Sequence, residues 1–251
     1  MKLHRVEILS RQRFGSHALL RYRWREGAPE PGQFVMVRPR VSAQVSDPFL
    51  NKPFFAHDYG DGMMSLLFEV RGRGTALLAD EDDELAVSEP LGKGFALDDG
   101  GLVLLVGGGV WVSPLKLLSR SLSRSGTPHE VYLEIPSVAP EAYRAWISEN
   151  YPAATLVPTD GSKEASHIVL DSLGDLGRYS GIYASGPDPM LAALRNASVD
   201  RVPAQLVLRE RMACANGSCY GCAVPVWRDG SRTYARACVE GPVFSAEALA
   251  W

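Results

Sequence analysis

Residues 102–114 have the sequence LVLLVGGGVWVSP, and this stretch determines which fold the second half of the chain can form. Its first five residues are apolar and predict a strand that is buried on both faces. Three glycines form a turn after it, and Ser113 and Pro114 are residue types that begin helices, as N-cap and first helical residue. The stretch therefore predicts a strand, a glycine turn and a helix over residues 113–123.

Strand-like and helix-like segments alternate downstream of this unit. The predicted strands are 131–135, 153–157, 168–170, 181–185 and 204–208, and the predicted helices are 141–148 and 189–196. Alternation of this kind is typical of a parallel α/β sheet. We expect an α/β domain over residues 100–208.

The segment upstream of residue 100 has a different sequence pattern, in which short strand-like runs are separated by turn residues. The predicted strands are 6–9, 17–24, 33–37, 53–56, 63–70 and 85–88, with a turn over 58–62 and one short helix over 75–79. Many short strands at close spacing are typical of an antiparallel barrel or sandwich. We expect a β-barrel over residues 1–99.

All four cysteines lie in the last segment, residues 209–251, where little regular pattern is visible. Cys214, Cys219, Cys222 and Cys238 have the spacing C-x4-C-x2-C-x15-C, which is the plant-type [2Fe–2S] spacing. Structural zinc is the alternative, although zinc ribbons usually present two C-x2-C pairs and this chain has one. The segment predicts a small domain that holds a [2Fe–2S] cluster.

The chain has 251 residues and a formal net charge of -3, which argues against a general nucleic-acid binder because such proteins need a basic surface. The longest apolar run is far shorter than the ~20 residues of a membrane helix. The N-terminus lacks the apolar region of a signal peptide. We expect a cytoplasmic protein with no nucleic-acid or membrane partner, in which disulfides are rare.

The glycines at 107, 108 and 109 are candidates for a phosphate site. Gly107, Gly108 and Gly109 let a phosphate approach the backbone, and the N-terminus of the following helix favours the anion. The alternative is a strand-to-helix turn that binds no ligand.

A second turn, at Ser185, Gly186 and Pro187, also follows a strand and opens a helix. Both turns are expected at the carboxyl edge of one parallel sheet, where ligands bind in such folds. Glu134 ends the intervening strand and could accept hydrogen bonds from a ribose, which would favour NAD over NADP because a carboxylate repels a 2′-phosphate. The alternative for Glu134 is an ordinary surface residue. In the first hundred residues, the turn 72–75 could likewise cradle a phosphate or be a tight turn capped by its threonine.

The order of barrel, α/β domain and cysteine segment resembles the electron-transfer subunit of bacterial NAD-linked dihydroorotate dehydrogenase, in the ferredoxin–NADP reductase superfamily. The resemblance covers essentially the whole chain. The motifs that carry it are the run from Glu210 to Cys222, the run from Ala237 to Phe244, and the turn from Pro90 to Phe95.

The resemblance implies three redox groups and one partner. It implies that the barrel binds FAD, that the four cysteines bind a [2Fe–2S] cluster, and that the two glycine turns bind NAD as co-substrate. The FAD contacts implied by the family's motifs fall on Lys52, Pro53, Phe54, Phe55, Leu67, Phe68, Glu69, Gly74 and Thr75. It further implies an FMN-containing catalytic subunit in a hetero-oligomer, a heterotetramer, which oxidises dihydroorotate in pyrimidine biosynthesis. The present chain would then carry no catalytic residue for dihydroorotate itself.

Five residues depart from the family's pattern, one of which, Asn216, stands for a glycine of the cluster loop. Lys52 stands for an arginine, Phe55 for a hydroxyl residue, Trp111 for a glycine and Ser185 for a cysteine. Two other functions therefore remain open: an NAD(P)H-dependent iron–sulfur flavoprotein reductase that serves another acceptor, and a degenerate scaffold that has lost NAD binding.

Overall fold

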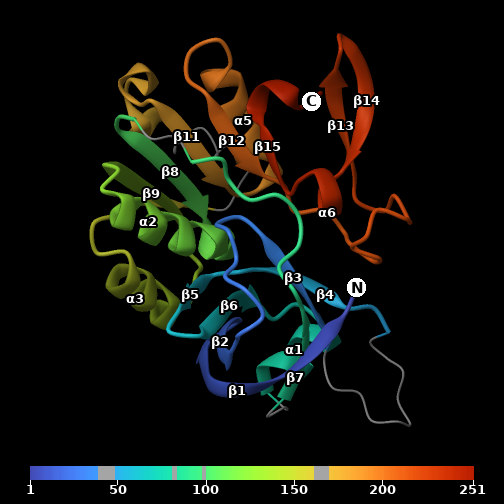
Figure 1. Ribbon diagram of the computed structural model, residues 1–251. Coiled ribbons are helices and arrows are strands. Elements are labelled where there is room, and N and C mark those ends of the chain that lie inside the picture. The colour runs from blue at the N-terminus through green and yellow to red at the C-terminus, as the bar shows by residue number, and fades with distance from the viewer. Residues whose placement is uncertain (39–48, 81–83, 98–99, 161–169) are drawn as a thin grey trace.

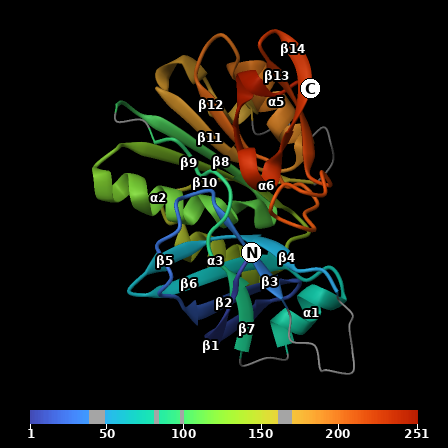
Figure 2. The same cartoon turned by 45° about the vertical axis from the view of Figure 1, so that its right-hand side comes forward.

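The computed structural model describes residues 1–38, 49–80, 84–97, 100–160 and 170–251 (Figure 1). An antiparallel sheet lies below an α/β sheet, and the C-terminal segment stands beside the α/β sheet (Figure 1 and Figure 2). The helices of the described residues are all too short or too polar to cross a membrane.

The N-terminal unit is a seven-stranded antiparallel sheet in the order β4-β3-β7-β1-β2-β6-β5. Its elements are β1 (Leu3–Phe14), β2 (His17–Arg23), β3 (Phe34–Arg38), β4 (Lys52–Phe55), β5 (Asp58–Gly60), β6 (Met63–Glu69), α1 (Arg73–Asp80) and β7 (Glu84–Ser88). The sheet curls into a half-barrel, which confirms the predicted antiparallel barrel in an open form. The turn predicted over 58–62 is wrong in extent, because residues 58–60 pair with β6 and only Asp61 and Gly62 turn, both at positive φ.

The second unit is a six-stranded sheet in the order β10-β9-β8-β11-β12-β15, parallel except for β15. Its strands are β8 (Val103–Gly108), β9 (His129–Pro136), β10 (Thr155–Thr159), β11 (Gly181–Ser185), β12 (Ala204–Val207) and β15 (Val243–Ser245); its helices include α2 (Ser113–Ser125), α3 (Glu141–Asn150) and α5 (Asp188–Ser198). Residues 168 and 169 of the predicted strand 168–170 lie outside the described part of the chain, and the strand prediction is wrong at Leu170, which is helical.

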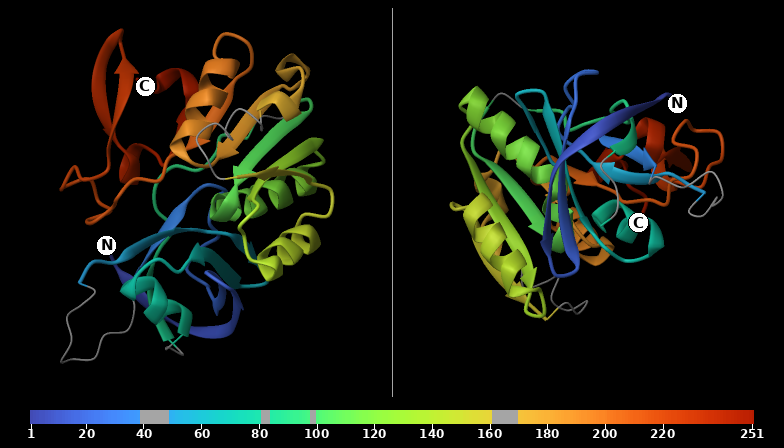
Figure 3. Two further views of the ribbon diagram at one scale, coloured as in Figure 1. Left: turned by 180° about the vertical axis from the view of Figure 1, so that it is seen from behind. Right: turned by 90° about the horizontal axis from the view of Figure 1, so that it is seen from below.

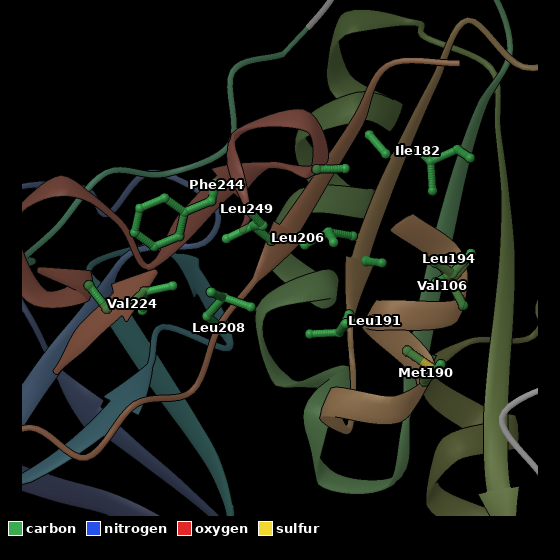
Figure 4. Close-up of a cluster of buried hydrophobic side chains, with 14 of the residues drawn as sticks. Val106, Ile182, Met190, Leu191, Leu194, Leu206, Leu208, Val224, Phe244 and Leu249 are labelled. Carbon is green, nitrogen blue, oxygen red and sulfur yellow. The ribbon is translucent and has the colours of Figure 1, made fainter. Parts of the chain in front are cut away.

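Helices cover both faces of this sheet, and this explains the apolar run in β8. Leu104 and Val106 pack with Leu191 and other α5 residues on one face (Figure 4). Val103 and Leu105 pack with α2 and α3 on the other face. Because every side chain from 103 to 106 is buried, each of them must be apolar.

The glycine turn differs in detail from the prediction. Gly107 and Gly108 continue β8, and η1 (Gly109–Val112) is a single 3-10 turn that leads directly into α2. Pro114 lies in the first turn of α2 as expected. Ser113 is not the N-cap: Val112 precedes the helix in helical conformation, and no side chain in the described structure caps α2.

The C-terminal segment contains more regular structure than its sequence pattern suggests. β13 (Ala223–Arg228) and β14 (Ser231–Arg236) form a hairpin, α6 (Ala237–Glu240) follows, and β15 joins the α/β sheet antiparallel to β12, with Leu206 opposite Phe244. Seen from behind, the hairpin stands to one side of the α/β sheet (Figure 3). The sheet therefore extends across the predicted domain boundary at 208/209.

Candidate functional site

An apolar cleft lies between the half-barrel and the α/β sheet, with about 610 Å³ of empty space that is partly open to solvent. The strands β4 and β6 supply much of its wall. Its lining is Phe34, Pro53, Phe54, Phe55, Leu67, Phe68, Glu69, Thr75, Val110, Trp111, Ser113, Leu208, Arg209, Glu210 and Met212. This lining includes every residue predicted to contact FAD except Lys52 and Gly74.

The cleft has the character that a flat aromatic ring requires. Its lining includes the aromatic residues Phe34, Phe54 and Phe55 together with Met212. Ser113 Oγ is buried and has no hydrogen-bond partner within the described structure. A buried hydroxyl without a partner costs about 1–3 kcal/mol, and a bound ring with polar edges could remove that cost. These residues fit a flavin ring.

The Thr75 hydroxyl holds the turn ahead of α1. Thr75 Oγ1 accepts hydrogen bonds from the backbone N–H groups of Arg71 (3.0 Å) and Gly72 (3.2 Å), and it donates to the carbonyl of Gly72 (2.9 Å). The geometry is that of a tight turn capped by its threonine, the alternative reading of this segment.

A second cleft crosses from the half-barrel to the carboxyl edge of the parallel sheet. Gly108, Gly109, Glu134 and Pro187 of the predicted dinucleotide residues line it. The half-barrel contributes Ser16, His17, Glu69 and Arg71 to the opposite wall. The two predicted glycine turns are therefore brought to one cleft.

Gly107, Ser185 and Gly186 lie behind this cleft and do not line it. A Cβ on Gly107 would lie 2.7 Å from Leu115 Cδ1, so this glycine makes room for the packing of α2. A Cβ on Gly186 would lie 1.9 Å from the methyl group of Met190. Both glycines are required by packing whether or not a ligand binds.

Glu134 is a buried side chain, so the surface alternative does not apply. Its Oε1 atom accepts a hydrogen bond of 2.9 Å from Thr159 Oγ1. Its Oε2 atom is buried without a partner in the part of the chain that the structure describes, and a Cβ on Gly108 would lie 3.0 Å from it. One carboxylate oxygen is therefore held in place while the other remains available at the cleft.

Three buried polar atoms without partners among the described residues lie at the same edge of the sheet. Ser113 Oγ follows β8 and η1, Glu134 Oε2 lies near the end of β9, and Ser185 Oγ ends β11. These strands are neighbours in the order β9-β8-β11. Because buried polar atoms are nearly always paired, this concentration indicates a ligand site.

Arg209, Tyr143 and His17 were not identified as site residues from the sequence, whereas Trp111 was already noted there as a departure from the family's glycine. Trp111 lines both clefts, and the guanidinium carbon of Arg209 lies 4.8 Å from the centre of its ring. Tyr143 of α3 donates a hydrogen bond of 2.9 Å to the carbonyl of Gly109 and stacks on His17 at 3.9 Å between ring centres. Burial lowers the pKa of His17. No local signal identifies these residues, because they come from separate elements.

The cysteines lie in two pairs. The Cys219 N–H is 3.4 Å from Cys214 Sγ, and the Cys238 N–H is 3.5 Å from Cys222 Sγ. Across the described residues, no three His, Cys, Asp or Glu side chains meet closely enough to hold a single metal ion. Two pairs of thiols fit a cluster of two irons better than one tetrahedral zinc.

The loop that carries the first three cysteines favours the thiolate form of Cys214. Hydrogen bonds from the backbone N–H groups of Asn216 and then Cys219 lower the pKa of Cys214 to about 6. Gly217 has a φ of 82°, which lets the loop reverse direction between the cysteines. Because the thiolate is the ligating form, this geometry suits metal binding.

Comparisons with known proteins agree with this arrangement. A family described as the iron–sulfur cluster binding domain of dihydroorotate dehydrogenase B matches residues 209–250. A relative from Caldanaerobacter subterraneus subsp. tengcongensis, named dihydroorotate dehydrogenase B (NAD(+)), electron transfer subunit, is 33% identical over 97% of this chain and 96% of its own. A relative of the same name from Geobacillus thermodenitrificans is 37% identical over 86% of this chain and 85% of its own.

A solved structure extends the agreement to the fold. The structure of an NADH-dependent reduced ferredoxin-NADP oxidoreductase, described for flavin-based electron bifurcation, is 25% identical and superposes with a TM-score of 0.78. The match covers 98% of this chain and 90% of that one, so the fold is of the ferredoxin reductase type. Together with the identity to the curated relatives over nearly their whole length, this places the chain in the family of electron transfer subunits of NAD(+)-dependent dihydroorotate dehydrogenase B.

Proposed function

We propose that this chain passes electrons between a dihydroorotate-oxidising partner subunit and NAD in pyrimidine biosynthesis, by way of a [2Fe–2S] cluster and FAD. One observation carries the proposal: the apolar cleft, the dinucleotide cleft and the start of the cysteine segment share walls. Trp111 lines both clefts, and Arg209, Glu210 and Met212, from the segment that bears the cysteines, line the first. Three redox groups bound at these places would be neighbours.

The chemistry explains why the three groups belong together. A nicotinamide exchanges two electrons as a hydride, a [2Fe–2S] cluster exchanges one at a time, and a flavin can do both. The protein's task is to hold these groups close together and to exclude water between them. The aromatic and aliphatic walls of the first cleft suit that task.

We assign the residues as follows. The cluster would be held by Cys214, Cys219, Cys222 and Cys238. The flavin ring would lie against Pro53, Phe54, Phe55, Leu67 and Phe68, with the Ser113 hydroxyl at its edge. The dinucleotide phosphates would approach Gly108 and Gly109, and Glu134 Oε2 would accept from a ribose hydroxyl, which favours NAD over NADP. Five predicted contacts remain that neither cleft includes in its lining: Lys52, Gly74, Gly107, Ser185 and Gly186.

The partner in this proposal is an FMN-containing catalytic subunit, assembled with this chain as a heterotetramer. The relatives' name, electron transfer subunit, supports a separate catalytic subunit. The cytoplasmic location expected from the sequence stays a prediction.

The test begins with the chain purified without oxygen. We expect about two irons and one FAD per chain, and NADH should bleach both the flavin bands and the cluster absorbance. The isolated chain should not oxidise dihydroorotate, and co-purification with the catalytic subunit should give dihydroorotate-dependent reduction of NAD. Cys219→Ser serves as the control, because it removes an exposed ligand thiol without touching either cleft.

A second function is favoured by one observation, the TM-score of 0.78 to an NADH-dependent reduced ferredoxin-NADP oxidoreductase. The alternative is a reductase that serves another iron–sulfur acceptor. It predicts flavin reduction by NADH without complex formation with the dihydroorotate-oxidising subunit. Dihydroorotate oxidation by the isolated chain, or a preparation with neither flavin nor cluster, would refute the proposed function.

A further inference from the structure

The indole of Trp111 stands where the two clefts meet. Trp111 lies in η1, two residues after Gly109, and its side chain is half-buried. It belongs to the lining of the apolar cleft and also to that of the dinucleotide cleft. Glu69 and Val110 are the other side chains common to both linings, and neither has comparable size.

Arg209 covers this indole from the cysteine segment. Its guanidinium carbon lies 4.8 Å from the ring centre, which is cation–π geometry. Arg209 is itself exposed, and such contacts are weak at exposed sites. We call these two side chains the Trp111–Arg209 partition.

The backbone beneath the partition is held more firmly than the partition itself. The Gly109 carbonyl accepts the hydrogen bond from Tyr143 Oη, and Tyr143 is fully buried against His17. At its other end, η1 continues directly into α2, which begins at Ser113. A rotation of the Trp111 side chain would break its contact with Arg209 and leave the hydrogen bond between Tyr143 and Gly109 in place.

We propose that Trp111 is a positioning residue that controls entry of the nicotinamide ring into the flavin cleft. This inference rests on the proposed function. The adenosine and phosphate part of the dinucleotide would bind at the sheet edge without disturbing Trp111. The nicotinamide would enter the apolar cleft only when the indole has turned away from Arg209.

The proposal makes a quantitative distinction between two ligands. In the open arrangement the Trp111 indole has turned away from Arg209. If only a small fraction of the molecules is open, the apparent affinity for NAD is the intrinsic affinity multiplied by that fraction. ADP-ribose, which lacks the nicotinamide, escapes this reduction. Removing the indole should therefore tighten the binding of NAD and leave that of ADP-ribose unchanged.

The experiment is calorimetric titration of the flavin-loaded protein with NAD⁺ and with ADP-ribose. For Trp111→Ala we expect NAD⁺ to bind about tenfold more tightly, with ADP-ribose unchanged within error. Arg209→Met, which keeps length and removes the charge, should shift NAD⁺ binding in the same direction by a smaller factor. Trp227→Ala is the matched control, because Trp227 is exposed on β13 and lines neither cleft. Thermal unfolding of each variant checks that it is folded, and Trp111→Leu replaces the alanine variant if that one does not fold.

Intrinsic fluorescence gives a readout that does not depend on turnover. NAD⁺ should change the tryptophan emission of the wild type and of the Trp227 variant, and ADP-ribose should not. An equal ratio of NAD⁺ to ADP-ribose affinity in wild type and Trp111→Ala would overturn the proposal, as would weaker NAD⁺ binding in the variant. Failure of both ligands to bind any variant would instead refute the dinucleotide site of the proposed function.

Discussion

The three consecutive glycines at 107–109 should respond differently to the same substitution, because a methyl group meets a different environment at each. In Gly107→Ala the new Cβ would lie 2.7 Å from Leu115 Cδ1 and 3.2 Å from Leu133 Cδ2, both in the core. Overpacking of a core costs about 1–3 kcal/mol, and loss of glycine's freedom in the unfolded chain returns about 0.4–1 kcal/mol. The midpoints of these two ranges leave a net loss of about 1.3 kcal/mol, or about 3–5 °C in Tm for a chain of this size.

Gly108→Ala should preserve stability and impair binding. Gly108 has φ −141° and ψ 131°, which alanine adopts freely. Its Cβ would lie 3.0 Å from Glu134 Oε2, the carboxylate oxygen that has no partner among the described residues, and Glu134 lines the dinucleotide cleft. A lost hydrogen bond to a charged group costs about 1.5–3 kcal/mol, so the Kd for NAD⁺ should rise at least about tenfold.

Gly109→Ala isolates backbone strain. Gly109 has a φ of 53°, and no heavy atom of the described structure lies within 4 Å of the added Cβ beyond its chain neighbours. The left-handed conformation costs an alanine about 1 kcal/mol, or about 2–4 °C. Thermal unfolding by circular dichroism and NAD⁺ titration by calorimetry measure the series. A Tm unchanged in Gly107→Ala, or an NAD⁺ affinity unchanged in Gly108→Ala, would refute the packing argument.

Three further outcomes are expected. Burial lowers the pKa of His57 from 6.5 to about 4. As the pH falls from 6.5 to 4, the unfolded chain therefore takes up a proton that the folded chain does not, and the free energy of unfolding should fall by up to about 3 kcal/mol. His57→Gln should flatten the pH dependence of Tm. Tyr143→Phe removes the 2.9 Å hydrogen bond to Gly109 and should lower Tm by about 2–4 °C, since one such bond contributes about 1 kcal/mol. Cys219→Ser should abolish iron binding, which iron analysis measures. Because Cys219 is exposed, the free energy of unfolding of the iron-free protein should change by less than about 0.5 kcal/mol, which thermal unfolding measures.

Much of the fold could be predicted from local patterns where a strand is buried on both faces. The prediction for 181–185 coincides with β11, and the helix predicted over 113–123 is α2 with two further residues. The strand is unambiguous because burial on both faces demands a continuous apolar run, and the helix is marked by Pro114 in its first turn. The antiparallel half-barrel was predictable for a similar reason, since its strands are bounded by strong turn residues.

The errors lie where pairing partners are distant in sequence. β15 has three residues and exists because β12 offers it an edge, which no local pattern reveals. Serine is a residue type that often caps helices, but Ser113 does not cap α2. The preceding residues in η1 are already helical, so the helix has no extended residue at its start. The cysteine spacing identified one candidate site directly, whereas Arg209 and Tyr143 reach the clefts only through tertiary packing.

The strand β15 also determines how the cysteine segment behaves mechanically. Because Val243–Ser245 hydrogen-bonds to β12, the cysteine segment is joined to the α/β sheet by strand pairing and not only by a flexible linker. This strand follows Cys238 closely in the chain, so the end of the cysteine segment cannot rotate away from the sheet while the pairing holds. A chain cut before residue 209 would leave β12 as a bare sheet edge, and an edge of that kind recruits other chains. The last 43 residues thus protect the solubility of the rest.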